Sequence, residues 1–244
     1  MKSNKIRVIG DVHGHSDKYA EIVKDCGKSI QVGDMGFNYS HFHDINSKTK
    51  VIKDFFYAGN HDNYDILNNP YNGLKNNLGD YGGLGDIFNS SFFVRGASSI
   101  DAAMRIHGYL KTYKKTWWFE EELSDHEFKI AMEMYYDKKP DIMFSHDSPL
   151  FLGPLLGSSK ALDMFNLPKN YYSKTQHYLQ KMYAIHQPKI WFFGHWHKDW
   201  HHKDDRTHFF CVDELSWFDL EENEDSYMVT NKDGNFTIEV SKFK

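Results

Sequence analysis

The sequence contains few cysteines, and this shortage excludes two classes of small scaffold. Its 244 residues include only Cys26 and Cys211. Two thiols so far apart are too few for a disulfide framework or for a zinc site made of thiolates. We therefore expect reduced thiols and a cytoplasmic protein.

Long apolar runs are also missing. No run approaches the roughly 20 residues that a membrane-spanning helix needs. The first residues pass from Met1 through four polar residues into the short apolar run at 6–9. Since no apolar core and no small-residue cleavage site follow, the sequence predicts neither a signal peptide nor a membrane protein.

Positive charge is scarce as well. The formal net charge is -5, and the only arginines are Arg7, Arg95, Arg105 and Arg206. A surface of this charge does not attract nucleic acid or anionic membranes by counterion release. An anionic substrate needs a local source of attraction, and bound divalent metal ions would supply one.

The apolar content of the sequence is sufficient for a large core. Apolar residues make up 40% and aromatic residues 16% of the chain, which argues against disorder. Because the candidate metal ligands described below extend from Asp11 to His197, we expect a single domain over residues 1–244.

Short runs rich in Ile, Val and Phe recur along the chain and have the length of buried strands. They lie at 5–9, 28–32, 54–58, 141–144 and 189–193. Between the first two runs, apolar residues with helical spacing follow Ser16, and Gly27 stands where a helix C-cap is expected. Strands that alternate with helices predict an α/β fold.

Two further helices are predicted by capping boxes, in which a serine is followed three residues later by Glu or Gln. The pairs are Ser124 with Glu127 and Ser173 with Gln176. Pro140 and Pro188 mark the ends of these helices, and each proline precedes one of the apolar runs.

Beyond His197 the pattern changes to strands alone. Residues 207–213, 226–230 and 235–240 have strand character, and residues 232–235 predict a hairpin turn between the last two. We expect these strands to form a second, antiparallel layer.

Each of the five apolar runs ends at a glycine or serine next to residues that can ligate metal. The five segments are Gly10-Asp11-Val12-His13, Gly33-Asp34, Gly59-Asn60-His61-Asp62, Ser145-His146 and Gly194-His195-Trp196-His197. In open α/β sheets, ligands bind at the carboxyl ends of the strands. Carboxylate, imidazole and amide donors suit manganese, iron, zinc or nickel better than magnesium or calcium.

These five segments, in this order, resemble the calcineurin-like metallophosphoesterase superfamily. The resemblance implies a β-sandwich of two mixed sheets flanked by helices, and a centre with two divalent metal ions, manganese being the first choice. It also implies that three residues bind one ion, three bind the other and Asp34 bridges them; the two groups are Asp11, His13, His197 and Asn60, His146, His195.

The family resemblance further implies a mechanism. Two ions that share a water can activate it as hydroxide for in-line attack on phosphorus. The reaction then needs no phosphoenzyme. His61 resembles the general acid that protonates the leaving alkoxide.

The resemblance departs from the protein serine/threonine phosphatase branch at one place. After Asp34 that branch has an Asp three residues later, then Arg and Gly, whereas this chain continues Met35-Gly36-Phe37-Asn38. The Asp that would orient His61 and the Arg that would hold the phosphate are both missing. Asp62, where that branch has Glu, also resembles the nuclease, nucleotide hydrolase and small bacterial or phage phosphatase members of the superfamily; of these we favour the single-domain phosphatases of bacteria and phages.

Several segments remain candidates for substrate binding. Arg95 and Arg105 are the arginines that we expect to contact phosphate, with an ordinary surface position as the alternative for each. Residues 111–118 mix lysines and aromatics, so they either stack a nucleobase or form a lid whose tryptophans pack into the core, which we favour. Residues 68–91, rich in Asn and Gly, predict a long loop that either borders the site or is a solvated insertion.

Three functions compete on this sequence. The first is a phosphomonoesterase acting on a small metabolite, a nucleotide or a nucleic-acid end. The second is a phosphodiesterase or nuclease on the same metal ions, which the net negative charge and the few arginines disfavour. The third is a non-catalytic scaffold with the same fold, which the complete ligand set disfavours.

Overall fold

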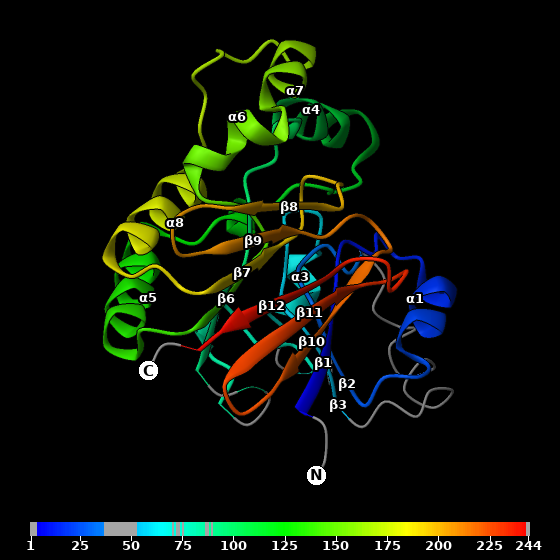
Figure 1. Cartoon of the computed structure of the whole chain (residues 1–244). Helices are drawn as coiled ribbons and strands as arrows, with labels where there is room; N and C mark the ends of the chain where they lie inside the picture. The colour runs from blue at the N-terminus through cyan, green and yellow to red at the C-terminus, as the bar shows by residue number, and fades with distance from the viewer. Residues whose placement is uncertain are drawn as a thin grey trace.

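In the computed structural model, the described residues form two sheets of six strands each, flanked by helices (Figure 1). These residues are 4–36, 53–69, 71, 74, 76–85, 88 and 90–242. Phe37 and Asn38, which carry part of the departure from the phosphatase branch, lie outside them.

The first sheet combines parallel and antiparallel strands. Its order is β12-β11-β10-β1-β2-β3. The three strands β1 to β3 run parallel, and β10 pairs antiparallel with β1. The bounds are β1 Asn4–Ile9, β2 Lys28–Gln31, β3 Lys53–Phe56, β10 Trp217–Glu222, β11 Ser226–Asn231 and β12 Thr237–Ser241.

The second sheet is also mixed, with parallel strands in its centre. Its order is β4-β5-β6-β7-β9-β8, and the two outermost strands, β4 and β8, are antiparallel to their neighbours. The bounds are β4 Tyr81–Gly83, β5 Ser91–Val94, β6 Ile142–Ser145, β7 Ile190–Phe193, β8 Trp200–Lys203 and β9 His208–Cys211.

Helices cover the outer face of each sheet and extend beyond one end of the sandwich. Helix α1 (Ser16–Val23) lies on the first sheet, and α5 (Asp125–Lys138) and α8 (Lys174–Ile185) lie on the second (Figure 1). A separate group projects at the top of the view, made of α4 (Ala102–Thr112), α6 (Gly153–Leu156) and α7 (Ser158–Met164). The short helices are α3 (Tyr64–Leu67), η1 (Phe119–Glu121) and η2 (Leu150–Leu152).

The central strands are apolar throughout because both of their faces are buried. In β7, Ile190 and Phe192 belong to the core between the sheets, whereas Trp191 and Phe193 pack under α5 and α8. Parallel strands covered on both sides typically lack the alternation of polar and apolar residues seen in strands with one wet face. The continuous apolar runs of the sequence therefore identify the parallel strands that are buried on both faces.

Most predicted elements are confirmed. All five apolar runs contain strands, and both capping boxes form: Ser124 Oγ accepts from the Glu127 backbone N–H, and Ser173 Oγ accepts from that of Gln176. The hairpin turn between β11 and β12 is also present, with Gly234 at a positive φ of 68°. No helix in the described part of the chain is long and apolar enough to cross a membrane.

Three local predictions were wrong. Helix α1 ends at Val23, before Gly27, because the chain already turns at residues 24 and 25. The described part of residues 68–91 is not a plain loop, since it contains β4 and the first residue of β5. The C-terminal strands do not form a layer of their own: β10 hydrogen-bonds to β1 and extends the first sheet, while β9 pairs parallel with β7 in the second.

Candidate metal centre

The predicted metal ligands meet at one edge of the sandwich. Each stands in the turn that follows a parallel strand, so the carboxyl ends of strands from both sheets face the same place. These strands are β1, β2 and β3 of the first sheet and β6 and β7 of the second.

The first ligand group consists of Asp11, His13 and His197. One donor atom of each lies within 4.8 Å of the other two. The Nε2 atom of His197 is 3.1 Å from Asp11 Oδ2 and 3.2 Å from the Nε2 of His13. Asp11 is buried, whereas the His197 side chain is 46% exposed, so this group is open to solvent on one side.

The second group consists of Asp34, His146 and His195, which meet the same 4.8 Å limit. His146 Nε2 lies 3.3 Å from Asp34 Oδ2 and 3.0 Å from Asn60 Oδ1. Asn60 therefore belongs with this group, as the family resemblance implies. Asp34 and His146 are fully buried, and the bridging role of Asp34 stays a prediction.

Three of the glycines that end the strands leave space for these ligands. A Cβ atom on Gly33 would lie closer than 3.0 Å to the His146 ring, and one on Gly59 would approach both His146 and Asp34 as closely. A Cβ on Gly194 would collide with the Asp11 carboxylate. The recurrence of glycine before the ligands has this steric cause.

Four of the ligands hold a left-handed backbone conformation that side chains rarely adopt. The φ angles are 48° for His13, 58° for Asp34, 67° for His195 and 47° for His197. Such conformations cost about 1–3 kcal/mol each and are concentrated at functional sites. The surrounding hydrogen bonds must hold the turns in place.

The tautomer of His146 suits a metal ligand. Its Nδ1 lies 2.8 Å from the carbonyl oxygen of Val32. Because a carbonyl can only accept, Nδ1 carries a hydrogen, which leaves Nε2, the atom facing Asp34 and Asn60, as the nitrogen that a metal ion would bind. A ring nitrogen that donates to a backbone carbonyl while the other binds metal is a common arrangement at metal sites.

The residues present fit a pair of divalent cations. Asp34 Oδ2 is buried and has no hydrogen-bond partner among the described residues, although an unsatisfied buried carboxylate oxygen is costly. A cation at the second group would give this oxygen a partner. The donor set of carboxylates, imidazoles and one amide oxygen matches manganese, iron, zinc or nickel.

The two buried ligands Asp34 and His146 shift each other's pKa. Burial raises the pKa of Asp34, but the positive charge of His146 at 3.3 Å outweighs this and holds the pKa below its usual value. Burial lowers the pKa of His146, and Asp34 raises it to about 10. In the metal-free protein the pair favours the charged form of both side chains, and a metal ion would compete with the proton of His146 for Nε2.

Asp62 holds the turns that carry Asp34 and His61. Its Oδ2 accepts hydrogen bonds from the backbone N–H groups of Asp34 at 3.0 Å and Gly59 at 2.8 Å, and its Oδ1 accepts from that of Gly36 at 2.9 Å. A buried carboxylate with three backbone donors joins the segments after β2 and β3. Hydrogen bonds to charged groups contribute about 1.5–3 kcal/mol each.

Asn60 is oriented by a buried network behind the ligands. Its Nδ2 donates to Ser99 Oγ at 2.9 Å, and Ser99 Oγ donates to Glu121 Oε2 at 2.6 Å. Since the amide nitrogen donates a hydrogen bond to Ser99, the amide oxygen is the atom that faces the metal group. Burial raises the pKa of Glu121 to about 8 against the opposing effects of Ser99 and Arg105.

Arg105 belongs to the same network. It donates to Ser99 Oγ at 2.5 Å and to the carbonyl of Thr116, and it lies 3.2 Å from Glu121 Oε1. One of its nitrogens is 3.5 Å from the carbonyl oxygen of Asn60. Its guanidinium therefore supports Asn60, and its contact with phosphate stays a prediction.

Arg95 is buried on the far side of this network. It donates to Asp80, to the carbonyl of Glu120 at 2.5 Å and to the hydroxyl of Tyr64 at 3.1 Å. It does not line the cavity described below. These contacts give Arg95 a structural role, and its contact with phosphate stays a prediction.

His61 lies beside the first ligand group. Its ring centroid is 5.4 Å from that of His13, and its backbone N–H donates to Asp34 Oδ1 at 2.7 Å. Burial lowers its pKa, Asp34 opposes this and Arg105 adds to it. The position is consistent with a proton donor at the metal centre.

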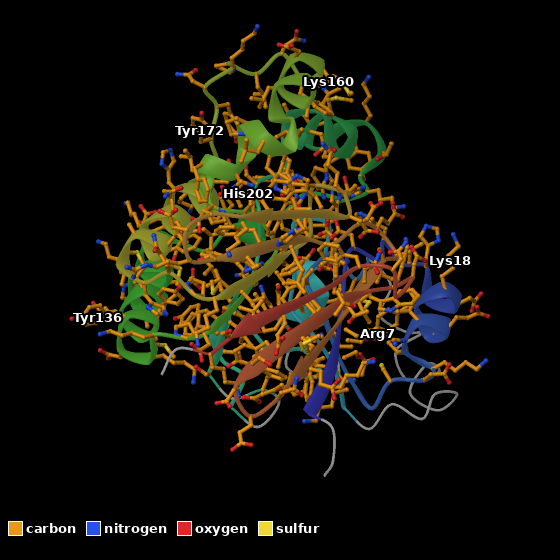
Figure 2. The ribbon with its side chains drawn as sticks, in the orientation of Figure 1. Arg7, Lys18, Tyr136, Lys160, Tyr172 and His202 are labelled. Carbon is orange, nitrogen blue, oxygen red and sulfur yellow. The ribbon has the colours of Figure 1, made fainter. Side chains whose placement is uncertain are left out.

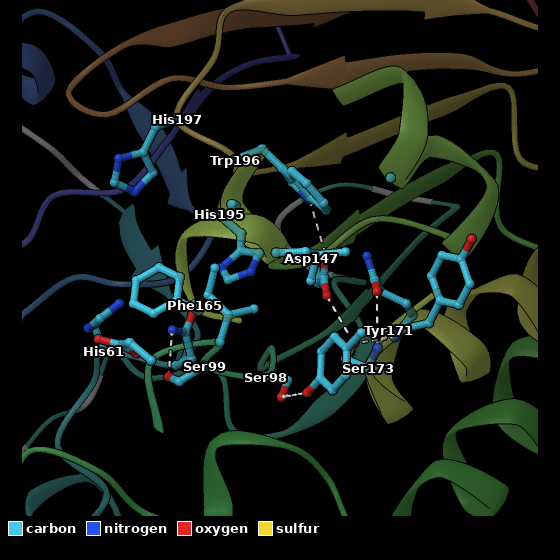
Figure 3. Close-up of a pocket in the computed structure, with 18 of the residues that line it drawn as sticks. His61, Ser98, Ser99, Asp147, Phe165, Tyr171, Ser173, His195, Trp196 and His197 are labelled. Atoms are coloured by element: carbon cyan, nitrogen blue, oxygen red, sulfur yellow. Dashed lines mark hydrogen bonds between the residues drawn. The ribbon is translucent and has the colours of Figure 1, made fainter. Parts of the chain in front are cut away.

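A cavity of about 320 Å³ adjoins the ligands. Its metal side is lined by His61, His195 and His197, which Figure 3 labels, and by Asp34 and Asn60. The rest of its lining includes residues 98–101, Ala161, Leu162 and Phe165 on and after α7, and Tyr171, Tyr172, Ser173 and Gln176 before and in α8. Substrate can therefore reach the second metal group from this cavity.

A family model for the calcineurin-like phosphoesterases matches residues 4–199, which include all seven predicted ligands. The chain belongs to the calcineurin-like phosphoesterase family. It is a metal-dependent phosphoesterase, with two groups of residues that can hold divalent ions. No curated protein matches this sequence.

Solved structures share this phosphoesterase fold at low sequence identity. A dimetal phosphatase from Danio rerio is 11% identical, with a TM-score of 0.57 over 97% of this chain and 98% of that one. GAP50, the anchor in the inner membrane complex of Plasmodium, is also 11% identical, with a TM-score of 0.56 over 98% and 89%. At these identities the likeness concerns the fold alone.

Sequence analysis missed several residues of this phosphoesterase site. Asp62 was noted only as a family marker, although its spacing of two from Asn60 could have suggested a supporting carboxylate. Asp147 directly follows His146, and that adjacency was the available signal. Ser99 and Glu121 are 22 positions apart, and no pattern in the sequence predicts that they meet behind Asn60.

Within residues 111–118, the structure supports the predicted core packing for Trp118 rather than the stacking of a nucleobase. Trp118 is buried and packs with Ala58 and Tyr64, next to the segment that carries Asn60. Trp117 is partly exposed. The segment contributes to the support of the site, and none of its residues lines the cavity.

Proposed function

We propose that the protein is a phosphomonoesterase that uses two divalent metal ions, manganese first, with iron, zinc or nickel as alternatives. The observation that carries the proposal is the convergence of all seven predicted ligands in two groups beside one cavity. The low cysteine content leads us to propose a reducing compartment, the cytoplasm.

When bound, the two ions supply a nucleophile from a shared water and stabilise the negative charge on the phosphoryl oxygens, so that no phosphoenzyme is needed. The residues of the chain hold the geometry. Asp62 fixes the turn of Asp34, and Ser99 directs the amide oxygen of Asn60 towards the metal group. Preorganised groups of this kind need no rearrangement during the reaction.

His61 is the proton donor in this proposal. It lines the cavity next to both ligand groups, where the leaving oxygen of a phosphomonoester would lie. The variant His61→Ala should retain metal and lose rate mainly on poor leaving groups, because good leaving groups depart without a proton. Equal losses on aryl and alkyl phosphates would remove His61 from this role.

The choice of monoester over diester rests on the cavity and on charge. The cavity extends from the ligands towards α7, and neither lysine nor arginine occurs among the described residues that line it. The test compares turnover of an aryl phosphate with that of its bis-ester, in the presence of manganese. We expect the monoester to react faster, and a preference for the bis-ester by about tenfold or more would overturn the assignment.

A scaffold function is the contrasting proposal. The fold alone does not decide, because GAP50 is described as an anchor and has a similar fold. The complete ligand set of this chain supports catalysis. Elemental analysis after purification without chelators should find metal, and a metal-free protein would favour the scaffold.

A further inference from the structure

Part of the cavity wall is apolar and aromatic. This part is formed by Phe165, Tyr171, Tyr172, Ile100, Leu162 and Trp196, the last of which stands between the ligands His195 and His197 in the chain. Apart from Trp196, these residues come from segments around α4 and α7, the helices that project above the sandwich (Figure 1). An aromatic wall facing a metal group that binds phosphate would contact the part of the substrate that is not phosphate.

Hydrogen bonds hold two of the aromatic side chains in place. The Trp196 indole Nε1 donates to Asp147 Oδ1 at 3.1 Å, and the hydroxyls of Tyr171 and Ser98 lie 3.1 Å apart (Figure 3). Asp147 is itself buried and accepts from Ser173 Oγ at 3.3 Å. The wall is thus built before substrate arrives, which reduces the entropy cost of binding.

The charge of the cavity excludes a second anionic group. Neither lysine nor arginine occurs among the described residues that line it, whereas three carboxylates, those of Asp34, Asp101 and Asp147, do. Lys160 is exposed on α7 at the top of Figure 2 and does not line the cavity. A polyphosphate, a sugar bisphosphate or a nucleic-acid strand would bring further negative charge next to Asp101, whose basic neighbour Arg105 is already engaged by Glu121 and Ser99.

We propose that this cavity binds the leaving group of the substrate, and that this leaving group is an uncharged alcohol carrying an aromatic ring that packs against Phe165. The inference rests on the proposed phosphomonoesterase function and names its substrate class. The volume of about 320 Å³ falls at the lower end of the range for small-molecule sites and fits a compact group.

Matched pairs of substrates test the proposal. 3-Phenylpropyl phosphate and propyl phosphate share the same type of primary alkoxide leaving group, so their intrinsic reactivities are alike. Adenosine 5′-monophosphate and ribose 5-phosphate form a second pair, which separates a nucleobase from a benzene ring. We expect the ring-bearing member of at least one pair to have a kcat/KM higher by about tenfold or more, from the burial of the ring. Equal values within both pairs would overturn the proposal.

Variants of single phenylalanines show which side chain causes the preference for the ring-bearing substrate. Phe165→Ala should reduce the ratio between the members of the preferred pair to near one. Phe119→Ala removes a phenylalanine that is 79% exposed and does not line the cavity, so it should keep the ratio. A ratio that survives Phe165→Ala would place the ring elsewhere and contradict the assignment.

Binding provides a readout that does not depend on turnover. 3-Phenylpropylphosphonate cannot be hydrolysed, and calorimetry of the metal-loaded protein should show tighter binding than for propylphosphonate, by a factor that Phe165→Ala abolishes. Ring-dependent binding without hydrolysis of any monoester would refute the proposed function and leave the cavity assignment in place. Hydrolysis of all monoesters without a ring effect would refute the cavity assignment alone.

Discussion

The two sides of the cavity are built by different means. The metal side combines buried polar residues with exposed or partly exposed histidines, and several of its turns have left-handed backbone conformations fixed by hydrogen bonds. The aromatic side consists mainly of partly exposed residues in segments outside the sandwich, with a few hydrogen bonds. The residues on the side that performs the chemistry are strongly constrained. The residues on the side that would select the substrate are packed more loosely.

This difference predicts how variants should behave. A change at a metal ligand should lower activity on all substrates by a similar factor, because every substrate shares the phosphoryl group, whereas a change at His61 should depend on the leaving group. A change on the aromatic side should alter the ranking of substrates.

The largest effect is expected from Asp34→Asn. Asparagine tolerates the left-handed backbone at this position and can still accept from the His61 N–H, so the change isolates the charge of the carboxylate. We expect activity to fall by at least about 100-fold on every substrate, together with loss of metal. Steady-state rates and elemental analysis would measure both. Asp233→Asn, in the exposed β11–β12 turn, is the control and should behave as wild type.

Gly59→Ala should disrupt the centre through its methyl group alone. The φ angle of Gly59 is not in the left-handed region, but its Cβ would lie closer than 3.0 Å to Asp34 and His146. Overpacking of this kind costs about 1–3 kcal/mol. We expect a lower melting temperature and reduced metal content. Gly85→Ala has open space around its Cβ and serves as the control; equal effects of the two variants would contradict the steric account.

Asp62→Asn tests the support of the turns. An asparagine offers one oxygen and one NH₂ group, so at least one of the three backbone N–H groups would face a donor. Loss of such a supporting partner typically lowers metal affinity by about 10–100-fold. Competition with a metal indicator dye would measure the change. Asp65→Asn, at an exposed ion pair with Lys115, should leave affinity unaltered.

The prediction with the smallest expected effect on activity concerns the dependence of folding stability on pH. The pKa of Glu121 is raised to about 8 in the fold, above the ordinary value of 4.5, so the folded state binds this proton more tightly than the unfolded state. The contribution of Glu121 to stability is therefore full below pH 4.5 and declines as the pH rises to about 8.

Glu121→Gln removes this titration. The unfolding free energy of the variant, relative to wild type, should rise between pH 5 and pH 8, by no more than about 1.4 kcal/mol per pH unit. Urea unfolding of the metal-free proteins at several pH values would measure it. Glu120→Gln, at the exposed neighbouring position, should show no such trend; a constant difference for Glu121→Gln would contradict the raised pKa.

The sequence predicted the metal side far better than the aromatic side, for physical reasons. A ligand such as Asp11 or His146 must follow a buried parallel strand at a glycine or serine, and strand, turn and ligand types all leave local patterns. The contacts of Phe165 and Tyr171 depend on how α6 and α7 pack above the sheet, which no local pattern encodes. The partnership of Ser99 and Glu121 is equally non-local.

The two sheets show the same limit. Strands β1, β2, β3, β6 and β7 were predicted as one alternating series, because hydrophobic runs mark burial but not sheet membership. The assignment of two mixed sheets came from the family resemblance and is confirmed. Half-exposed strands such as β8 and β10 lack a continuous apolar run and were missed.

The most direct test of the account is a crystal structure of the protein grown with manganese, with the ions located by anomalous scattering. The account predicts two peaks per chain. One should contact Asp11, His13 and His197, the other Asn60, His146 and His195, and both should contact Asp34. A single peak, or peaks away from Asp34, would contradict the dinuclear centre.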